Sequence, residues 1–329
     1  MAISGWYKSG KELIEEMKET QVPDGMLAIW YLGQAGIVVK AAEGTFAIDP
    51  YLGHPEPDVR RFAAPFAPEE LDFLDAVLCT HNHSDHLDPY TLKGIAAVSP
   101  ETKFIVPRPW TNVVEDIGVR AENILGAAVG EIIRMESREA NASNRIVGAT
   151  TEKSIHTDSA PAVEEMAASS EMVIHPVPAA HEELTKDANG DYENLGYVLA
   201  FGAASVYHAG DTVEWETMTK ELRQYPIDVA CLPINGSDWK RKRANIIGNL
   251  NSREAANVAE EIGADLLIPL HYDLFPHNGE DPGNLADYMF REHAGHKYHF
   301  MAPGERFWYS RSRVYVTIQS QANLHKMCE

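Results

Sequence analysis

Basic residues are scarce in this sequence. Its 28 Lys and Arg residues stand against 49 Asp and Glu residues in 329 positions, which leaves a formal net charge of −21 at pH 7. Affinity for nucleic acids and anionic membranes comes mainly from Lys and Arg side chains, and an acidic surface repels both partners. The composition therefore argues against nucleic-acid binding and against membrane attachment.

Cysteines and long apolar runs are scarce as well. Cys79, Cys231 and Cys328 are scattered and form no C-x-x-C pair, so neither a disulfide framework nor a zinc knuckle is expected. No apolar run reaches the roughly 18 residues of a membrane-spanning helix, and the N-terminal MAISGWYKSG lacks the features of a secretory signal. We therefore expect a cytoplasmic protein.

The apolar content is nevertheless high enough for a sizeable core, with 44% hydrophobic and 9% aromatic residues. Short apolar runs alternate with amphipathic segments, which is typical of an α/β protein. Helices are predicted over residues 8–20 and 251–262, and in the second of these Asn251 and Glu254 have the spacing of a capping box. No linker divides the chain, so we predict one domain over residues 1–329.

Two other segments carry predictions about local structure. Residues 213–222 are predicted to be helical. Residues 136–170 are rich in Ser, Ala, Asn and Glu and have weak periodicity. We interpret this second segment as an insertion, an irregular excursion or flap outside the core.

The segment 80–89, THNHSDHLDP, holds His81, His83, Asp85 and His86 directly after the apolar run AVLCT. A buried strand delivers the side chains at its end to a rim, where polar groups can converge. The first two histidines share one side of an extended chain, and the other two residues lie on the following turn. Imidazole and carboxylate groups suit zinc, iron or manganese. A solvated loop with Asp85 as a helix cap is the alternative, but clustered ligand types at this spacing have few structural uses.

At these residues the chain resembles the metallo-β-lactamase superfamily, whose signature is H-x-H-x-D-H. Further matches follow in the order of the family: His181 in PVPAAHEE, Asp211 in YHAGDT and His271 in LIPLHYD. Asp49 in FAIDP matches an early aspartate that supports the ligand loop in the family. His208 precedes Asp211 by three positions, and we interpret it as a supporting or packed residue rather than as a ligand.

Within the superfamily the chain is most similar to the L-ascorbate-6-phosphate lactonase branch. The similarity is carried by VPDGMLAIWYLGQAGIVVK, SVYHAGDT and NSREAANVAEEIGADLLIPLHYDLF. It covers most of residues 10–133 and 171–310 and fails in residues 136–170. The resemblance implies a four-layer αββα sandwich with two divalent metal ions, manganese or zinc.

The resemblance also implies a role for each matching residue. His81, His83 and His181 would hold one ion, Asp85, His86 and His271 the other, and Asp211 would bridge them. A hydroxide between the ions would attack an ester or lactone carbonyl, and Asp85 would carry the proton to the leaving oxygen.

The implied function is hydrolysis of a lactone in a small, phosphorylated sugar acid, which in this branch is L-ascorbate 6-phosphate. Two alternatives stay open. A phosphodiesterase that acts on a small cyclic or lipid phosphate would use the same ligands, and a non-catalytic metal-binding scaffold would keep them without turnover. The helix at 8–20 and the segment 136–170 are candidates for contacts in a homo-oligomer.

A dense basic cluster, WKRKR at residues 239–243, follows the apolar run DVACLPI. Lys240, Arg241 and Arg243, with Asn235 nearby, are candidate binding residues for an anionic small-molecule substrate, because the acidic body of the protein would otherwise repel it. A solvated turn or a subunit contact explains the cluster equally well.

Overall fold

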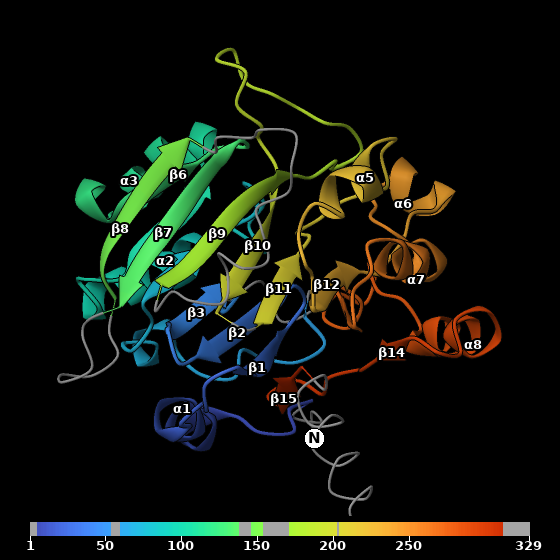
Figure 1. Ribbon diagram of the computed structural model, residues 1–329, viewed down its shortest axis with the longest axis horizontal. Coiled ribbons are helices and arrows are strands. Elements are labelled where there is room, and N and C mark those ends of the chain that lie inside the picture. Colours follow the sequence, from blue (N-terminus) through green and yellow to red (C-terminus); the bar gives the residue numbers. More distant parts are fainter. Residues whose placement is uncertain (1–4, 54–59, 138–145, 154–170, 203, 312–329) are drawn as a thin grey trace, which may run out of the picture.

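The computed structural model describes residues 5–53, 60–137, 146–153, 171–202 and 204–311 (Figure 1). These residues form two mixed β-sheets that pack face to face, with helices on the outer face of each sheet. The arrangement is a four-layer αββα sandwich, which confirms the predicted fold class.

The first sheet has seven strands among the described residues, in the order β15-β1-β2-β3-β4-β5-β6. Its strands are β1 (Met26–Gly33), β2 (Gly36–Ala41), β3 (Gly44–Ile48), β4 (Ala76–Leu78), β5 (Lys103–Pro107), β6 (Ile124–Ala127) and β15 (Arg306–Ser310). β1 to β3 form an antiparallel meander, whereas β3 to β6 pair in parallel. Its outer face carries α1 (Gly10–Glu19), α2 (Pro89–Val98), α3 (Thr111–Ile117) and the 3-10 turns Pro68–Glu70, Arg108–Trp110 and Ala121–Asn123.

The second sheet has eight strands in the described part of the chain, in the order β14-β13-β12-β11-β10-β9-β7-β8. Its strands are β7 (Glu131–Ser137), β8 (Ile146–Lys153), β9 (Glu171–Pro178), β10 (Leu195–Phe201), β11 (Ala204–His208), β12 (Val229–Pro233), β13 (Leu266–Leu270) and β14 (Lys297–Tyr298). β11 to β14 pair in parallel. The remaining helices are α5 (Met218–Leu222), α6 (Trp239–Arg243), α7 (Ser252–Glu261) and α8 (Pro282–Glu292), which gather beside β12 and β14 in Figure 1.

Strand β1 shows why both faces of the first sheet are apolar. Side chains alternate between the two faces of a strand, so Ile29 packs in the core between the sheets while Trp30 packs against α1 on the outer face. Both side chains are fully buried. Burial of one such side chain contributes about 1.5–3 kcal/mol. The strand is therefore apolar at nearly every position rather than alternately polar.

The helices mostly follow the local signals in the sequence. α1 lies within the predicted range, and α7 begins after Asn251, whose side chain accepts hydrogen bonds from the backbone N–H groups of Arg253 and Glu254. Glu254 accepts in return from the Asn251 N–H group at 2.9 Å, which completes the predicted capping box. The longest helix among the described residues, α8, has 11 residues, and no helix described here is long and apolar enough to cross a membrane.

The prediction of a helix over residues 213–222 is wrong for its first half, because only Met218–Leu222 is helical. Val213 instead pairs with Ala180 as an isolated bridge, and its N–H group donates to the carbonyl of Ala180 at 2.8 Å. A contact with a residue far away in the sequence thus overrides the local helical pattern. The same contact joins the loops that carry His181 and Asp211.

The segment predicted to be an irregular excursion, residues 136–170, is only partly described. Residues 138–145 and 154–170 lie outside the described residues. Ile146–Lys153 forms β8 and pairs with β7 at the edge of the second sheet, so the prediction of irregular structure is wrong there. This stretch, IVGATTEK, is rich in β-branched residues, which favour strands.

Candidate metal centre

Four loops meet at one edge of the sandwich, and each follows the carboxyl end of a strand. Residues 81–86 follow β4, His181 follows β9, Asp211 follows β11 and His271 follows β13. β4 belongs to the first sheet and the other strands to the second, so both sheets supply side chains to one place. The fold brings together all seven residues that the sequence marks as metal ligands.

The first group consists of three histidines whose ring nitrogens face one another. His83 Nδ1 lies 3.0 Å from His81 Nε2 and 3.1 Å from His181 Nε2. The side chain of His81 is buried, and that of His181 is nearly so. Nitrogen lone pairs that converge in this way repel one another unless a cation or a proton lies between them. The geometry fits a metal ion held by three imidazoles.

Asp49 fixes the proton on Nδ1 of one ring in each group, His81 and His86, from behind. Its Oδ2 atom accepts hydrogen bonds from the Thr80 hydroxyl and from His86 Nδ1, both at 2.7 Å. The single hydroxyl proton of Thr80 is thereby used, so Thr80 Oγ1 accepts from His81 Nδ1 at 3.0 Å. His81 and His86 therefore both carry a proton on Nδ1 and turn Nε2, the atom that can bind a metal ion, toward the site. Asp49 lies where the sequence places it, whereas Thr80 was not expected to take part.

The second group consists of Asp85, His86 and His271. Asp85 Oδ2 lies 3.6 Å from His86 Nε2 and 3.5 Å from His271 Nε2. Asp211 stands between the two groups: its Oδ1 atom is 3.3 Å from His86 Nε2, and its Oδ2 atom is 3.2 Å from His271 Nε2 and 4.0 Å from His181 Nε2. The Asp211 carboxylate thus lies within reach of both groups and could contribute to an ion in either one.

The electrostatics of the two groups differ. Burial lowers the pKa of His81 well below its usual value and that of His181 to about 4, so both rings are neutral and keep their lone pairs. Burial also lowers the pKa of His271, but the charges of Asp211 and Asp85 outweigh it and raise the pKa to about 9. The second group therefore carries negative charge that attracts either a proton or a cation.

Two atoms in the described part of the chain test whether a metal fits. His86 Nε2 and Asp211 Oδ1 are buried and have no hydrogen-bond partner. A buried polar atom without a partner costs about 1–3 kcal/mol, and these two atoms face each other at 3.3 Å, so a proton or a cation is needed between them. A divalent cation would satisfy both, so the donor set fits the metals that imidazole and carboxylate ligands accept.

His208 supports the loop that carries Asp211, as the sequence suggests. Its Nε2–H group donates to the carbonyl of Ala35 at 2.8 Å, and its Nδ1 atom accepts from the N–H group of Gly210 at 3.2 Å. Both ring nitrogens are used, so His208 has no lone pair left for a metal. Gly210 has φ +63°, and a Cβ atom there would lie 2.7 Å from Thr80 Cβ. Only glycine therefore allows the loop that carries Asp211 to lie this close to Thr80.

Gln34 is part of the site although the sequence did not single it out. It lies in the turn between β1 and β2, it is 1% exposed, and its Nε2 atom is 2.9 Å from Asp85 Oδ2 and 2.8 Å from His271 Nε2. A polar residue between two glycines in an otherwise apolar stretch, GQAG, was the signal that could have revealed it.

A cavity of about 650 Å³ opens above the two groups. Its floor is formed by residues of the metal centre and its walls by the loops after α6 and β13. The lining residues are His83, Ser84, Asp85, His181, Asp211, Asn245, Ile246, Ile247, His271, Phe275, Pro276, His277 and Asn278. The volume is within the usual range of small-molecule sites.

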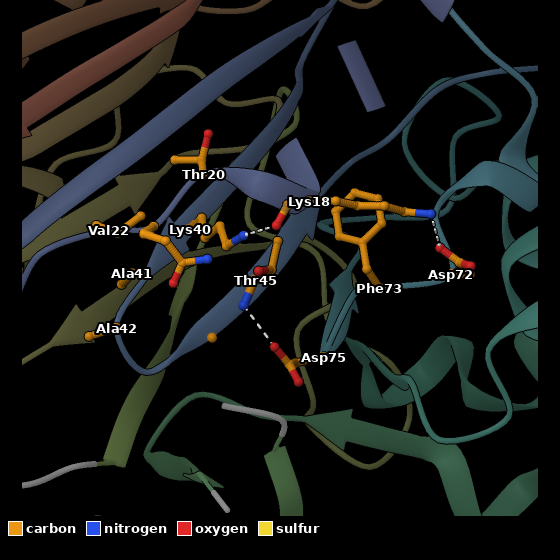
Figure 2. Close-up of a pocket in the computed structure, with 12 residues that line it drawn as sticks. Lys18, Thr20, Val22, Lys40, Ala41, Ala42, Thr45, Asp72, Phe73 and Asp75 are labelled. Carbon is orange, nitrogen blue, oxygen red and sulfur yellow. Dashed lines mark hydrogen bonds and ion pairs between the residues drawn. The ribbon is translucent and has the colours of Figure 1, made fainter. Parts of the chain in front are cut away.

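A second cavity, of about 660 Å³, lies between the end of α1 and the β2–β3 hairpin (Figure 2). Its polar groups bind one another: Lys18 pairs with Asp72 at 2.7 Å, and Thr45 donates to Asp75 at 2.8 Å. Lys40 donates to the carbonyls of Met17 and Lys18 at the end of α1. Because these groups stabilise the fold around the hairpin, we place the functional site at the cavity above the metal centre.

The predicted substrate residues have different positions relative to that cavity. Asn235 is fully buried, and its amide donates to Asn278 Oδ1 at 3.0 Å. Arg241 donates to the same oxygen at 3.1 Å, so both residues contact the cavity wall from behind. Lys240 and Arg243 are exposed on α6 and do not line the cavity. A role in substrate binding stays a prediction for all four residues.

The comparisons with known proteins agree with the fold and the site. Fold and centre together define a metallo-hydrolase of the αββα class. The sequence profile of the β-lactamase superfamily domain matches residues 45–272, a range that includes all seven candidate ligands. The chain belongs to the metallo-β-lactamase superfamily.

Curated relatives in this superfamily resemble the branch indicated by the sequence. The chain is 24% identical over 310 residues to a protein of Escherichia coli named probable L-ascorbate-6-phosphate lactonase, covering 86% of this chain and 80% of that protein. A protein of the same name from Salmonella newport gives the same values.

Solved structures show the same fold. A metallo-hydrolase from Ignicoccus hospitalis has a TM-score of 0.59 at 22% identity, covering 87% of this chain and 100% of that one. An isothiocyanate hydrolase from Delia radicum gut bacteria has a TM-score of 0.60 at 19% identity, covering 86% of this chain and 99% of that one. At these identities the likeness describes the architecture and leaves the substrate open.

Proposed function

We propose that this protein hydrolyses the lactone ring of a small, phosphorylated sugar acid, with L-ascorbate 6-phosphate as the first substrate to test. The observation that carries the proposal is the convergence of two ligand groups on Asp211 at the floor of a small-molecule cavity. The likeness over 86% of the chain to proteins named probable L-ascorbate-6-phosphate lactonase supports the choice of substrate.

Each ligand group has a place in this proposal. His81, His83 and His181 would hold one manganese or zinc ion, Asp85, His86 and His271 the other, and Asp211 would contact both. When bound, two such ions lower the pKa of a water between them and polarise a substrate carbonyl, which supplies a nucleophile and an electrophile at neutral pH. Asp49, Thr80 and His208 hold the ligands in orientation from behind.

Asp85 is the carboxylate that can exchange a proton with the substrate. Its side chain is 18% exposed and lines the cavity, whereas those of Asp211 and Asp49 are 6% and 0% exposed. Burial raises the pKa of Asp85, but His86 and His271 outweigh it and hold the pKa well below its usual value. Asp85 is therefore ionised at neutral pH, and it would accept a proton and pass it to the leaving oxygen.

The cavity walls suit a compact polyol better than an extended chain. Asn245, His277 and Asn278 offer polar groups to hydroxyls, and Ile246 and Phe275 offer apolar surface to a carbon skeleton. The net charge of −21 disfavours long polyanions such as nucleic acids, while one small anion can be drawn in by metal ions on the cavity floor. We propose a small anionic molecule as the partner and keep homo-oligomerisation and action in the cytoplasm as expectations.

The test is a substrate panel on chelator-stripped protein reloaded with Mn²⁺ or Zn²⁺. Lactones of sugar acids, including L-ascorbate 6-phosphate, are compared with bis(4-nitrophenyl) phosphate, and acid release is followed by pH-stat. We expect metal-dependent lactone opening that Asp85→Asn reduces at least about 100-fold and that Asp116→Asn, an exposed position on α3, leaves unchanged.

Two other results would overturn the proposal. Turnover of the phosphodiester with no lactone opening would make the protein a phosphodiesterase. Two bound ions without turnover of any substrate in either class would favour the metal-binding scaffold.

A further inference from the structure

An arginine and three asparagines form a chain of hydrogen bonds behind the wall of the cavity above the metal centre. Arg241 Nη1 donates to Asn278 Oδ1 at 3.1 Å, and Asn235 Nδ2 donates to the same oxygen at 3.0 Å. Asn249 Nδ2 in turn donates to Asn235 Oδ1 at 3.1 Å. Asn235 and Asn249 are buried, whereas Asn278 is half-buried and lines the cavity. The chain therefore connects a cation to the cavity wall.

The arginine settles the orientation of each amide. A guanidinium group has only donors, so the atom of Asn278 beside Arg241 must be the oxygen. Asn235 then has to present its Nδ2 group to that oxygen, which leaves its own Oδ1 atom to accept from Asn249. The Oδ1 atom of Asn249 is buried without a partner in the part of the chain that the structure describes, so nothing at that end opposes this orientation.

The nitrogen end of the Asn278 amide is available to a ligand. Its oxygen accepts two hydrogen bonds and so uses both lone pairs. Its Nδ2 group has no hydrogen-bond partner among the described residues. The two ends of a planar amide point in different directions, so Nδ2 faces the cavity while Oδ1 faces Asn235 and Arg241 behind it. Asn278 therefore offers the cavity N–H donors and no acceptor.

The loop that carries Asn278 is held by backbone hydrogen bonds. The Asn278 N–H group donates to the Phe275 carbonyl at 3.1 Å, and the Glu280 N–H group donates to the Tyr272 carbonyl at 3.1 Å. The same loop begins at His271, a candidate metal ligand on the cavity floor. Because the donor is in place before a ligand arrives, binding has little ordering cost to overcome.

The charge of Arg241 strengthens this donor. Its side chain is 12% exposed, and its ion pair with Asp238 at 2.7 Å holds the guanidinium in position. Hydrogen bonds in a chain polarise one another, so a donor from a cation to the amide oxygen makes the N–H groups of the same amide better donors. Such donors bind an anionic oxygen more strongly than a neutral one.

We propose that Asn278 Nδ2 is a specificity-determining donor that binds the anionic group of the substrate, and that Arg241 acts through it as a positioning residue. This inference rests on the proposed function, because it assigns the phosphate of the sugar acid to one wall of the same cavity. None of the described residues that line the cavity is Lys or Arg. Asn278 thus brings the effect of a cation to the wall while the cation itself stays behind it.

The experiment compares Asn278→Ala and Asn278→Asp with the wild type, and uses Asn112→Asp, at an exposed position on α3, as the control for added charge. The probe is D-sorbitol 6-phosphate, a phosphorylated polyol without a lactone, titrated into Mn²⁺-loaded protein by calorimetry. We expect Asn278→Ala to weaken its binding about 10-fold because the donor is lost. Asn278→Asp should weaken it at least as much, because one carboxylate oxygen still accepts from Arg241 while the other faces the phosphate. Asn112→Asp should leave it unchanged.

The two Asn278 variants separate a donor from other roles. If Asn278 only tied its loop to Arg241, the carboxylate of Asn278→Asp would keep that tie and the affinity of the wild type. If only the charge in the cavity mattered, Asn278→Asp would weaken binding and Asn278→Ala would not. Either pattern, or a wild type that does not bind the probe, would overturn the inference.

The role of Arg241 is tested by combining variants. Arg241→Met should weaken binding of D-sorbitol 6-phosphate in the wild type but have little further effect in Asn278→Ala, because its path to the ligand is already lost. Equal losses in both backgrounds would show that Arg241 acts independently of Asn278.

Two outcomes distinguish this inference from the proposed function. Lactone opening by the wild type, with the same affinity for D-sorbitol 6-phosphate in both Asn278 variants, would overturn the role of Asn278 and leave the reaction intact. The expected binding pattern in a protein that opens no lactone would overturn the reaction and keep Asn278 as the residue that recognises the anion.

Discussion

Asp49 Oδ2 accepts a hydrogen bond from His86 Nδ1 at 2.7 Å, and both side chains are fully buried. The pair sets which nitrogen of His86 faces the metal centre, because a carboxylate can only accept and so requires the proton on Nδ1. Through Thr80, the same carboxylate also sets the tautomer of His81. One buried aspartate thus prepares a ligand in each of the two groups.

Replacing Asp49 by asparagine should therefore weaken metal binding without unfolding the protein. The asparagine side chain has nearly the same size, and asparagine tolerates the backbone φ of +47° at this position. Its amide no longer requires both Thr80 and His86 to donate, so we expect metal affinity to fall about 10- to 100-fold. Titration calorimetry of Asp49→Asn against the surface variant Asp116→Asn measures this. Equal affinities would show that the pair does not control the ligand tautomers.

The metal-free protein should lose stability as pH rises. The pKa of His271 is raised to about 9 in the folded, metal-free state and is about 6.5 in an unfolded chain. Its protonation thus contributes stability that is complete below about pH 6.5 and is lost as pH rises through about 9. The melting temperature of the chelated protein, measured between about pH 6 and about pH 10, follows this loss, because that range spans both pKa values.

A bound ion should remove this pH dependence, because it takes the place of the proton between His271, Asp85 and Asp211. Asparagine tolerates the left-handed backbone at position 271, so His271→Asn should keep the fold. This variant should reduce the pH dependence of stability in the chelated protein. A chelated wild type as stable at high pH as at neutral pH would contradict the assignment.

Gly210→Ala should destabilise the protein more than a glycine replacement elsewhere. At Gly210 the new Cβ atom would meet Thr80 at 2.7 Å, whereas at Gly263, with a similar φ of +76°, nothing lies within 4 Å. Gly263→Ala then measures the conformational cost alone, about 1 kcal/mol, and Gly210→Ala should exceed it by about 1–3 kcal/mol. Urea unfolding gives the free energy of unfolding of both variants. Equal losses would mean that Thr80 moves away and the new Cβ atom at position 210 causes no clash.

Arg241 and Arg243 lie on the same short helix but should differ in their effect on substrate binding. Arg241 donates to Asn278, which lines the cavity, whereas Arg243 stands over the ring of Trp239 at 5.8 Å and is exposed. A hydrogen bond from a charged donor contributes about 1.5–3 kcal/mol. We therefore expect Arg241→Met to raise KM about 10-fold and Arg243→Met to leave it unchanged. The opposite order would place the binding surface on the exposed side of α6.

Several features of this protein could be predicted because their causes are local in the sequence. Asn251 and Glu254 cap α7 across one turn, and the apolar run of β1 specifies a strand buried on both faces. The spacing of H-x-H-x-D-H placed four ligand residues in one loop after a strand. The residues were identified by type and separation, and the fold then brought them together.

Other features depend on contacts between residues that are far apart in the chain. Val213 leaves the predicted helix because it pairs with Ala180, and Ile146–Lys153 becomes regular because β7 offers it hydrogen bonds. A local sequence pattern contains no information about such distant partners. The hydrogen bonds to those partners stabilise the observed backbone by more than the local helical or irregular tendency opposes it.

The composition of the sequence alone determined the acidic character of the molecule, and its motifs, through their resemblance to a known superfamily, indicated the class of fold and the seven candidate ligands. Only the tertiary structure decided which atoms of those ligands face the site, because Thr80 and Asp49 set the ring tautomers through hydrogen bonds. It also placed Gln34, which is 51 residues from Asp85 and 237 residues from His271 in sequence. Ligand geometry depends on distances of a few tenths of an ångström, and these are set by the packing of the two sheets.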